Sequence, residues 1–265
     1  MKTLLKKLAF LSFAFLALSA SQHALAETCN AEQLMEFIRE HNLEARYTEH
    51  INTLSAALNI NLNAPMITDI RPDYEQIIRS IIADLPGIPF DRSTICIKPY
   101  VLQAASLCYV EPSMISSATT QQPILRRFIF VNEDFMTTLL SHKQYQKLRF
   151  MIAHEVGHLV SEHSLINTKR NLQIDFLMPD EKVKELFCLN NAFRKRRQEA
   201  ATDQWAVNAL NSKEGALAYF TDTITQSNSI CLIADPHDAH PSCQYRLDCI
   251  RYDHIELPWV NWEVS

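Results

Sequence analysis

The spacing of apolar positions along the chain predicts a mostly helical protein. Apolar residues recur every three or four positions in the polar-rich stretch 31–59, which indicates one or two helices. The same period predicts a helix over 72–85, with Pro72 in its first turn, where proline is tolerated. Further segments with this spacing predict helices at about 134–141, at 143–164, over the long region 179–211 with room for one break, at 213–225 and at 241–251.

A second pattern predicts a small sheet. Residues 93–110 are rich in β-branched and aromatic side chains around Pro99, and the run Arg-Phe-Ile-Phe-Val at 127–131 is the strongest strand signal in the chain. Residues 111–123 are rich in Ser and Thr and predict a loop. We therefore expect an α+β fold, predominantly helical, in which the small sheet packs beside the helix at 143–164.

The first 26 residues have the pattern of a secretory signal peptide. Three lysines precede the apolar run 8–18, and Ala24-Leu25-Ala26 is a small-x-small cleavage site. An uncleaved anchor is the alternative. No later run reaches the length of a membrane helix, so we expect no integral membrane segment in the mature chain. The expected divisions are 1–26 as signal peptide, 27–92 as an N-terminal helical region and 93–265 as the main domain, in a periplasmic or secreted protein.

Charge and cysteine content refine this expectation. Cleavage would remove three Lys and no acidic residue, so the net charge of −5 would become −8, and we expect no attraction to nucleic acid. The basic run 194–197 is interpreted as a solvated helix face. All seven cysteines follow the signal segment, where disulfides can form. We expect a Cys96–Cys108 bridge and one bridge from Cys231, although spacing does not fix the connectivity. No feature of the sequence fixes an oligomeric state.

Residues 154–158 read His-Glu-Val-Gly-His and predict half of a zinc site. On a helix, His154 and His158 lie on one face, so both imidazoles can reach one zinc ion. Glu155 lies beside them and can hold the water that zinc activates. The pentapeptide is short enough to occur by chance, so other segments must decide. Gly157 costs about 1 kcal/mol relative to Ala within a helix. It is either simply tolerated or allows another backbone to approach closely.

A catalytic zinc needs a third protein ligand. The three-histidine class would place it at Ser164, so that class is excluded, and His163 points about 140° away from His158 on a continuous helix. We therefore expect a surface or structural role for His163. Glu199 and Asp203 share a face of a later helix. Glu199 can be the third ligand, and Asp203 can accept the second N–H of a ligand histidine.

A third segment begins at His240-Pro241 and includes Arg246, and His240 and Arg246 are candidate donors to a developing oxyanion. In this order, the three segments resemble the gluzincin metallopeptidases of the CAAX prenyl endopeptidase and HtpX heat-shock protease type. That family shows H-E-x-x-H, then E-x-x-x-D, then H-P-x-x-x-x-R, and the match covers about 128–251. In two departures, the loop 113–125 has no glycine, and Thr202 stands where the family has alanine.

The resemblance implies a zincin-type catalytic domain that uses Zn²⁺ to hydrolyse peptide bonds. It assigns metal binding to His154, His158 and Glu199, catalysis to Glu155, His240 and Arg246, and ligand orientation to Asp203. It also suggests that the strand residues Phe128, Ile129, Phe130 and Val131 form an edge strand that pairs with extended polypeptide substrate.

These assignments lead to two functional hypotheses and a bland alternative. The first is an exported zinc endopeptidase that acts on envelope or secreted proteins, with a role in protein quality control. The second is a zinc-stabilised, non-catalytic binding or chaperone-like periplasmic protein, suggested by the N-terminal third and the altered loop. The bland alternative is coincidence: buried histidines and surface acids in a helical domain without metal.

Overall fold

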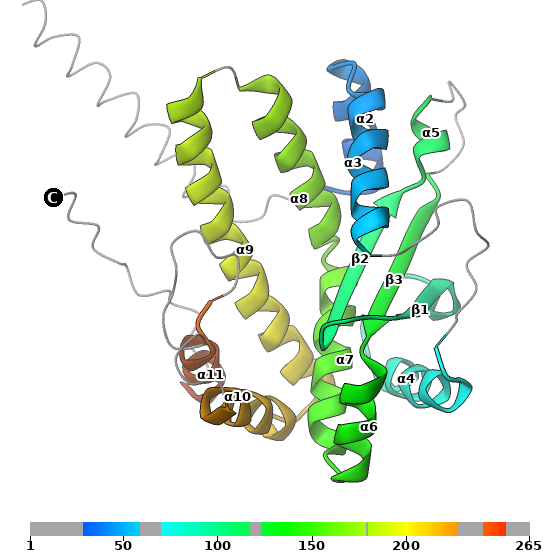
Figure 1. Cartoon of the computed structure of the whole chain (residues 1–265), viewed down its shortest axis with the longest axis vertical. Helices are drawn as coiled ribbons and strands as arrows, with labels where there is room; N and C mark the ends of the chain where they lie inside the picture. The colour runs from blue at the N-terminus through cyan, green and yellow to red at the C-terminus, as the bar shows by residue number, and fades with distance from the viewer. Residues whose placement is uncertain (1–28, 59–69, 117–122, 179, 227–240, 253–265) are drawn as a thin grey trace, which may run out of the picture.

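The computed structural model describes residues 29–58, 70–116, 123–178, 180–226 and 241–252. The predicted signal segment, His240 and Cys231 lie outside these ranges. The described part is mostly helical with one small sheet, as the sequence predicts (Figure 1). One hydrophobic core runs from the first described helix to the last. The expected division at residues 92 and 93 stays a prediction.

Ten α-helices and three strands make up the described residues, together with two short turns of other helix types. In chain order the helices are α2 (Ala31–Glu40), α3 (Glu44–Ala57), α4 (Pro72–Asp84), α5 (Pro112–Ser116), α6 (Glu133–Ser141), α7 (Tyr145–Val160), α8 (His163–Leu172), α9 (Glu181–Leu210), α10 (Glu214–Gln226) and α11 (Cys243–Tyr252), with a 3-10 turn η1 (Arg92–Thr94) and a π-helical turn η2 (Gln173–Leu177). The strands are β1 (Ile95–Pro99), β2 (Ala104–Val110) and β3 (Leu125–Val131).

Helix α7 lies at the centre of the fold and carries the pentapeptide. It packs against β2 and α4 on the side of the sheet, and against α9 and α10 on the other side (Figure 1). Eleven of its 16 residues are buried, including His154 and Glu155. A helix buried on most sides is less amphipathic than a surface helix, and its polar residues need partners inside the protein.

The three strands are arranged in the order β1-β3-β2. Strand β3 pairs in parallel with β1 and antiparallel with β2, so both of its edges are hydrogen-bonded. The predicted edge role of Phe128, Ile129, Phe130 and Val131 is therefore wrong, because these residues lie on the central strand and are 0–3% exposed. A continuous apolar run is typical of a strand that is buried on both faces, and residues 128–131 are such a run.

The expected Cys96–Cys108 bridge is also wrong. Cys96 lies opposite Phe128 on one side of β3, and Cys108 lies opposite Arg127 on the other side. Two strand spacings of about 4.8 Å separate them. A disulfide needs Cα atoms within about 7 Å, so the central strand prevents this bond, and both residues keep their thiols. Cys243 is disulfide-bonded. Cys231, the other predicted bridging residue, lies outside the described residues.

Most predicted helices are confirmed, with two differences that matter for the site. The predicted helix at 143–164 is two helices, because α7 ends at Val160 and Glu162 adopts the left-handed conformation with φ 50°. Helix α8 and η2 then fill a region for which no helix was predicted beyond residue 164. The predicted loop at 111–123 contains the short helix α5, and the long region 179–211 forms α9 without a break.

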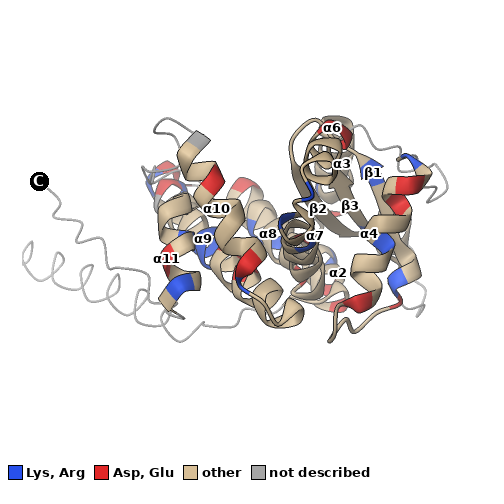
Figure 2. Cartoon of the chain, turned by 90° about the horizontal axis from the view of Figure 1, so that it is seen from below, with Lys and Arg blue, Asp and Glu red and all other residues tan. Residues whose placement is uncertain are grey.

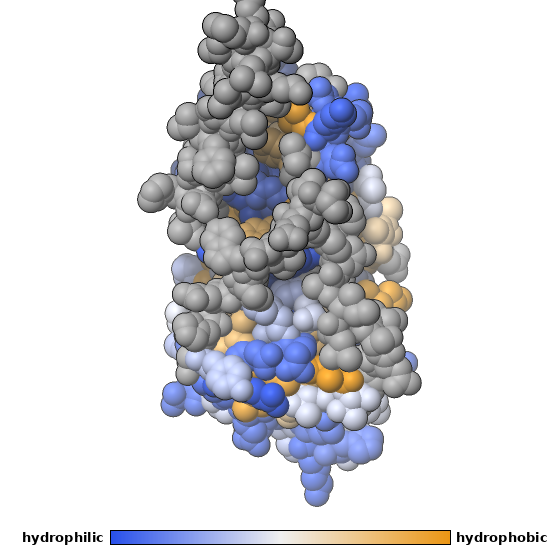
Figure 3. All heavy atoms as spheres, turned by 90° about the vertical axis from the view of Figure 1, so that its left-hand side faces the viewer, coloured by the Kyte–Doolittle hydropathy of each residue, from blue (hydrophilic) through white to orange (hydrophobic). Residues whose placement is uncertain are grey.

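Among the described residues, acidic and basic side chains are mixed on the side of the molecule that Figure 2 shows. Lys and Arg are interspersed with Asp and Glu on the outer helices (Figure 2). The basic run 194–197 lies on α9 with half-buried and exposed side chains. On the α9 side of the molecule, hydrophilic and hydrophobic residues are mixed among the described atoms (Figure 3). None of the described helices combines the length and the apolar character that a membrane span requires.

Candidate active site

Helices α7 and α9 bring three potential metal ligands together. His154 and His158 project from adjacent turns of α7, and Glu199 projects from α9. The two Nε2 atoms are 3.1 Å apart. Glu199 places one carboxylate oxygen 3.4 Å from Nε2 of His154 and the other 3.3 Å from Nε2 of His158. Among the described residues, these three form a group whose ligand atoms all lie within 4.8 Å of one another.

This donor set fits zinc in geometry and in charge. Two ligands of a tetrahedral zinc, each about 2.0–2.1 Å from the ion, are about 3.3–3.4 Å apart, close to the separations seen here. This largely buried site contains three carboxylates, those of Glu155, Glu199 and Asp203, and one guanidinium, that of Arg246. Their formal charges add up to −2. A divalent cation would bring these formal charges to zero, which matters because unbalanced buried charge is costly.

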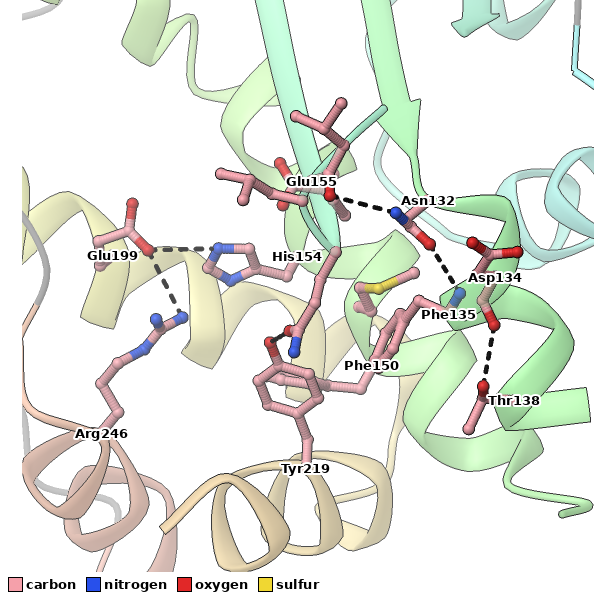
Figure 4. Close-up of a pocket in the computed structure, with 15 residues that line it drawn as sticks. Asn132, Asp134, Phe135, Thr138, Phe150, His154, Glu155, Glu199, Tyr219 and Arg246 are labelled. Carbon is pink, nitrogen blue, oxygen red and sulfur yellow. Dashed lines mark hydrogen bonds and ion pairs between the residues drawn. The ribbon is translucent and has the colours of Figure 1, made fainter. Parts of the chain in front are cut away.

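Asp203 and Arg246 form a support behind the ligands. Oδ1 of Asp203 lies 2.9 Å from Nδ1 of His154, where it can accept the ring proton as predicted. Arg246 donates two hydrogen bonds of 2.7 Å to the carboxylate of Asp203. Its Nη2 also lies 3.5 Å from Glu199 (Figure 4). These contacts place Arg246 against the carboxylates of Asp203 and Glu199, and its predicted oxyanion role stays a prediction.

The same contacts shift the pKa values of the site. Burial alone would lower the pKa of His154, but Asp203 and Glu199 outweigh it and raise that pKa to about 10. Burial would raise the pKa of both carboxyls. Hydrogen bonds from the histidines hold the pKa of Glu199 well below its usual range, and Arg246 lowers that of Asp203. The metal-free site therefore carries a proton on His154 that a metal ion must displace.

His163 does not point away from the site, so that prediction is wrong. The turn at Glu162 returns the chain toward α7, and Nδ1 of His163 lies 2.9 Å from Nδ1 of His158. Burial, together with the nearby His158, lowers the pKa of His163 to about 3. The angle of about 140° between His158 and His163 applies only to one continuous helix. The left-handed residue between α7 and α8 is Glu162 rather than a glycine, so the sequence does not mark where the helix breaks. Residue spacing therefore could not reveal the contact between His158 and His163.

Gly157 is explained by the close packing of α7 against α9. A Cβ atom at this position would lie 2.8 Å from Cγ2 of Thr202 and 2.9 Å from the ring of Trp205. Real Cβ contacts are not that short, so simple tolerance does not account for this glycine. The approaching atoms belong to side chains of α9 rather than to its backbone. Thr202 and Trp205 lie on α9 within two turns of Glu199. Their packing against Gly157 therefore sets the distance between α7 and α9, the two helices that carry the candidate ligands.

A cavity of about 720 Å³ opens beside the ligands. His154, Glu155, Glu199 and Arg246 line it together with residues of α6, α10 and the segment before β2 (Figure 4). Glu155 is 8% exposed. The remaining lining residues are Val101, Leu102, Gln103, Ala104, Asn132, Asp134, Phe135, Thr138, Phe150, Met151 and Tyr219. Of these, Tyr219 donates a hydrogen bond to the side chain of Gln103, which lies 116 positions earlier in the chain. No motif in the sequence predicted that Tyr219 would reach the site.

Comparison with known proteins agrees with this geometry. Residues 125–254 match Peptidase family M48, a range that contains the pentapeptide, Glu199, Asp203 and Arg246. Searches of curated proteins and of solved structures found no match. Family and site together make the protein an enzyme with zinc as its cofactor, and the non-catalytic alternative and the coincidence are set aside. Residues 125–254 thus carry the pattern of Peptidase family M48, and the protein is a zinc metalloendopeptidase whose candidate ligand set is His154, His158 and Glu199.

Proposed function

We propose that this enzyme is exported and cleaves extended segments of unfolded or misassembled envelope or secreted proteins. The export part rests on the signal-peptide pattern of residues 1–26. The substrate part rests chiefly on one observation: the accessible end of edge strand β2 lies at the cavity that contains Glu155.

Strand β2 offers backbone groups to a substrate. Asn132 N–H donates to the Gln103 carbonyl and Glu111 N–H donates to the Ile124 carbonyl, which fixes the odd-numbered residues of β2 as those bonded to β3. The N–H and C=O groups of Ala104 and Ser106 therefore point away from β3. Consistent with this alternation, the Val110 carbonyl accepts a hydrogen bond from Tyr47 on the outer side.

Only the first half of this edge is accessible. Ala104, Ala105 and Ser106 are half-buried, whereas the residues from Leu107 onward are buried, and α2 and α8 pack against β2. An extended peptide could add to the sheet at Ala104 and Ser106, as in other complexes formed by strand addition. A folded protein could not present such a strand without opening. This edge therefore favours unfolded or locally extended substrates.

The residues of the site suit peptide hydrolysis. A bound zinc ion supplies Lewis acidity, which polarises a carbonyl group and acidifies water. The Glu155 carboxylate lines the cavity and can accept a proton from the attacking water. It can then donate this proton to the leaving amine, so that water is added across the broken C–N bond. Arg246 and Asp203 keep the ligand side chains in place while this proton moves.

The first experiment uses Glu155→Gln in the mature protein, with unfolded casein as substrate. We expect this variant to bind zinc like the wild type but to lose cleavage by at least about 100-fold, because general base catalysis is lost. Chelator should stop cleavage by the wild type, and added zinc should restore it. Full zinc-dependent cleavage by Glu155→Gln would contradict the proposed mechanism.

Export is tested separately, by N-terminal sequencing of the protein from the producing cells. The sequence should begin at Glu27, and an intact leader would argue against export.

The second experiment tests the edge strand. Ser106→Pro removes an N–H that points away from β3, so the sheet should persist while substrate binding weakens. We expect a raised KM for casein with unchanged zinc content. Ala105→Pro is the matched control, because it removes an N–H that bonds to β3 and should lower stability instead. An unchanged KM in a folded Ser106→Pro protein would exclude pairing at β2.

A further inference from the structure

His163 is a buried imidazole beside the zinc site that the catalytic steps above do not use. It is 9% exposed, begins α8, and contacts His158 through Nδ1. It does not belong to the described residues that line the cavity. Contact with substrate is therefore not its function, and its effect must pass through His158.

The two ligand histidines have different partners on the side away from the ligand cluster. Nδ1 of His154 faces the Asp203 carboxylate at 2.9 Å. Nδ1 of His158 faces another imidazole, that of His163, also at 2.9 Å. In both residues the opposite nitrogen, Nε2, points toward Glu199. Metal-bound histidines usually donate their second N–H to a carboxylate, a backbone carbonyl or water, so the imidazole partner is unusual.

The chemistry of the contact assigns its protons. To present a lone pair at Nε2, the ring of His158 must carry its proton on Nδ1. Nδ1 of His163 must then be the acceptor, with the proton of that ring on Nε2. The reverse arrangement would protonate His158 at Nε2 and prevent metal binding. Thr202 does not compete, because its hydroxyl donates to the Gln198 carbonyl at 2.7 Å and lies farther from His163, at 3.4 Å.

We propose that His163 is a positioning residue, whose neutral ring accepts the Nδ1 proton of His158 and so fixes the tautomer and orientation of that zinc ligand. Packing holds the acceptor in place, since His163 lies between α7 and the buried Thr202 of α9. A neutral acceptor also leaves the charge of the site unchanged. A carboxylate at this position would add a fourth negative group to a site that a divalent ion already balances.

Variants at position 163 separate hydrogen bonding from packing. His163→Leu fills the space without an acceptor, and we expect zinc affinity to fall about 10–100-fold, as for other outer partners of metal ligands. His163→Asn can place its Oδ1 near the position of Nδ1 and should recover most of the loss. His142→Leu, at an exposed histidine that ends α6, is the matched control and should bind zinc normally. Affinity is measured by competition with a chromophoric chelator, and the visible spectrum of the cobalt-substituted proteins reports the ligand geometry.

Nitrogen NMR of the wild-type zinc protein tests the same proposal without a mutation. Long-range proton–nitrogen spectra distinguish the two neutral tautomers of each ring. We expect the Nδ1–H form for His158 and the Nε2–H form for His163. A His163 ring protonated at Nδ1 would overturn the proposal. So would wild-type zinc affinity in His163→Leu, or equal losses in the Leu and Asn variants, which would indicate packing alone. None of these measurements depends on the substrate proposed above.

Discussion

The charge of His154 depends on its two acidic neighbours. The side chain is almost fully buried, and burial alone would favour the neutral ring. Asp203 and Glu199 reverse this preference and raise the pKa from 6.5 to about 10. Zinc and the proton therefore compete for the same residue, and the metal-free protein keeps the proton at neutral pH.

This competition predicts how the stability of the metal-free protein depends on pH. Because the folded-state pKa of His154 exceeds the unfolded value, the proton stabilises the fold fully below about pH 6.5. That stabilisation is lost as the pH rises from 6.5 toward 10. We expect the free energy of unfolding, measured with urea in the presence of chelator, to fall over this range. For Asp203→Asn, the free energy of unfolding should fall less steeply with pH. An identical slope in both proteins would refute the assignment of this pH dependence to His154.

At the level of single residues, sequence reasoning found the groups whose spacing carries chemistry. The structure brings His154, His158 and Glu199 together as predicted. The two histidines were found from their i, i+4 spacing on a helix, and Glu199 from the order of motifs in the family. His163 and Tyr219 were missed for a common reason. Each reaches the site through a contact between elements: His163 after a left-handed glutamate, Tyr219 from α10 toward Gln103. Spacing within one helix contains no information about such contacts.

At the level of elements, the distance between α7 and α9 is set by Gly157. Gly157→Ala should raise helix propensity by about 1 kcal/mol, but its Cβ would overlap Thr202 and Trp205. Overpacking costs about 1–3 kcal/mol. We therefore expect a net loss of stability of up to about 2 kcal/mol and weaker zinc binding, because Glu199 moves with α9. Thermal unfolding of the metal-free variant and chelator competition would measure the two effects.

Ala201→Gly is the control for this substitution. Ala201 is exposed on the same helix, α9, so its change should cost about the helix-propensity difference of 1 kcal/mol and leave zinc affinity unaltered. If Gly157→Ala stabilised the protein and kept full zinc affinity, the close packing would not constrain the site.

The same scale shows why the sheet was predicted in part. The apolar run of β3 and the β-branched character of 93–110 identified the strands. Strand order is a property of pairing, and β3 inserts between β1 and β2 although it follows both in the chain. That insertion places residues 128–131 on the central strand and leaves β2 as an edge strand. It also separated Cys96 from Cys108, so both errors have one physical origin.

At the level of the whole molecule, the ligand set joins two sides of the fold. Helix α7 packs on the sheet through β2, and α9 approaches it from the other side, next to α11 (Figure 1). His154 and His158 come from the first helix and Glu199 from the second. A metal ion bound between them would therefore stabilise the packing of these parts against each other, in addition to its chemical role.

This arrangement predicts a zinc-dependent stability of the entire chain. A ligand that binds only the native state at 100 times its Kd adds about 2.7 kcal/mol. For a chain of this size, about 2–4 °C of Tm accompanies each kcal/mol. We expect chelation to lower Tm by about 5–10 °C and added zinc to restore it. Glu155→Gln should keep the whole shift, because Glu155 is not a ligand, whereas Glu199→Ala should lose it. A shift that persisted in Glu199→Ala would mean that zinc stabilises the protein from another site.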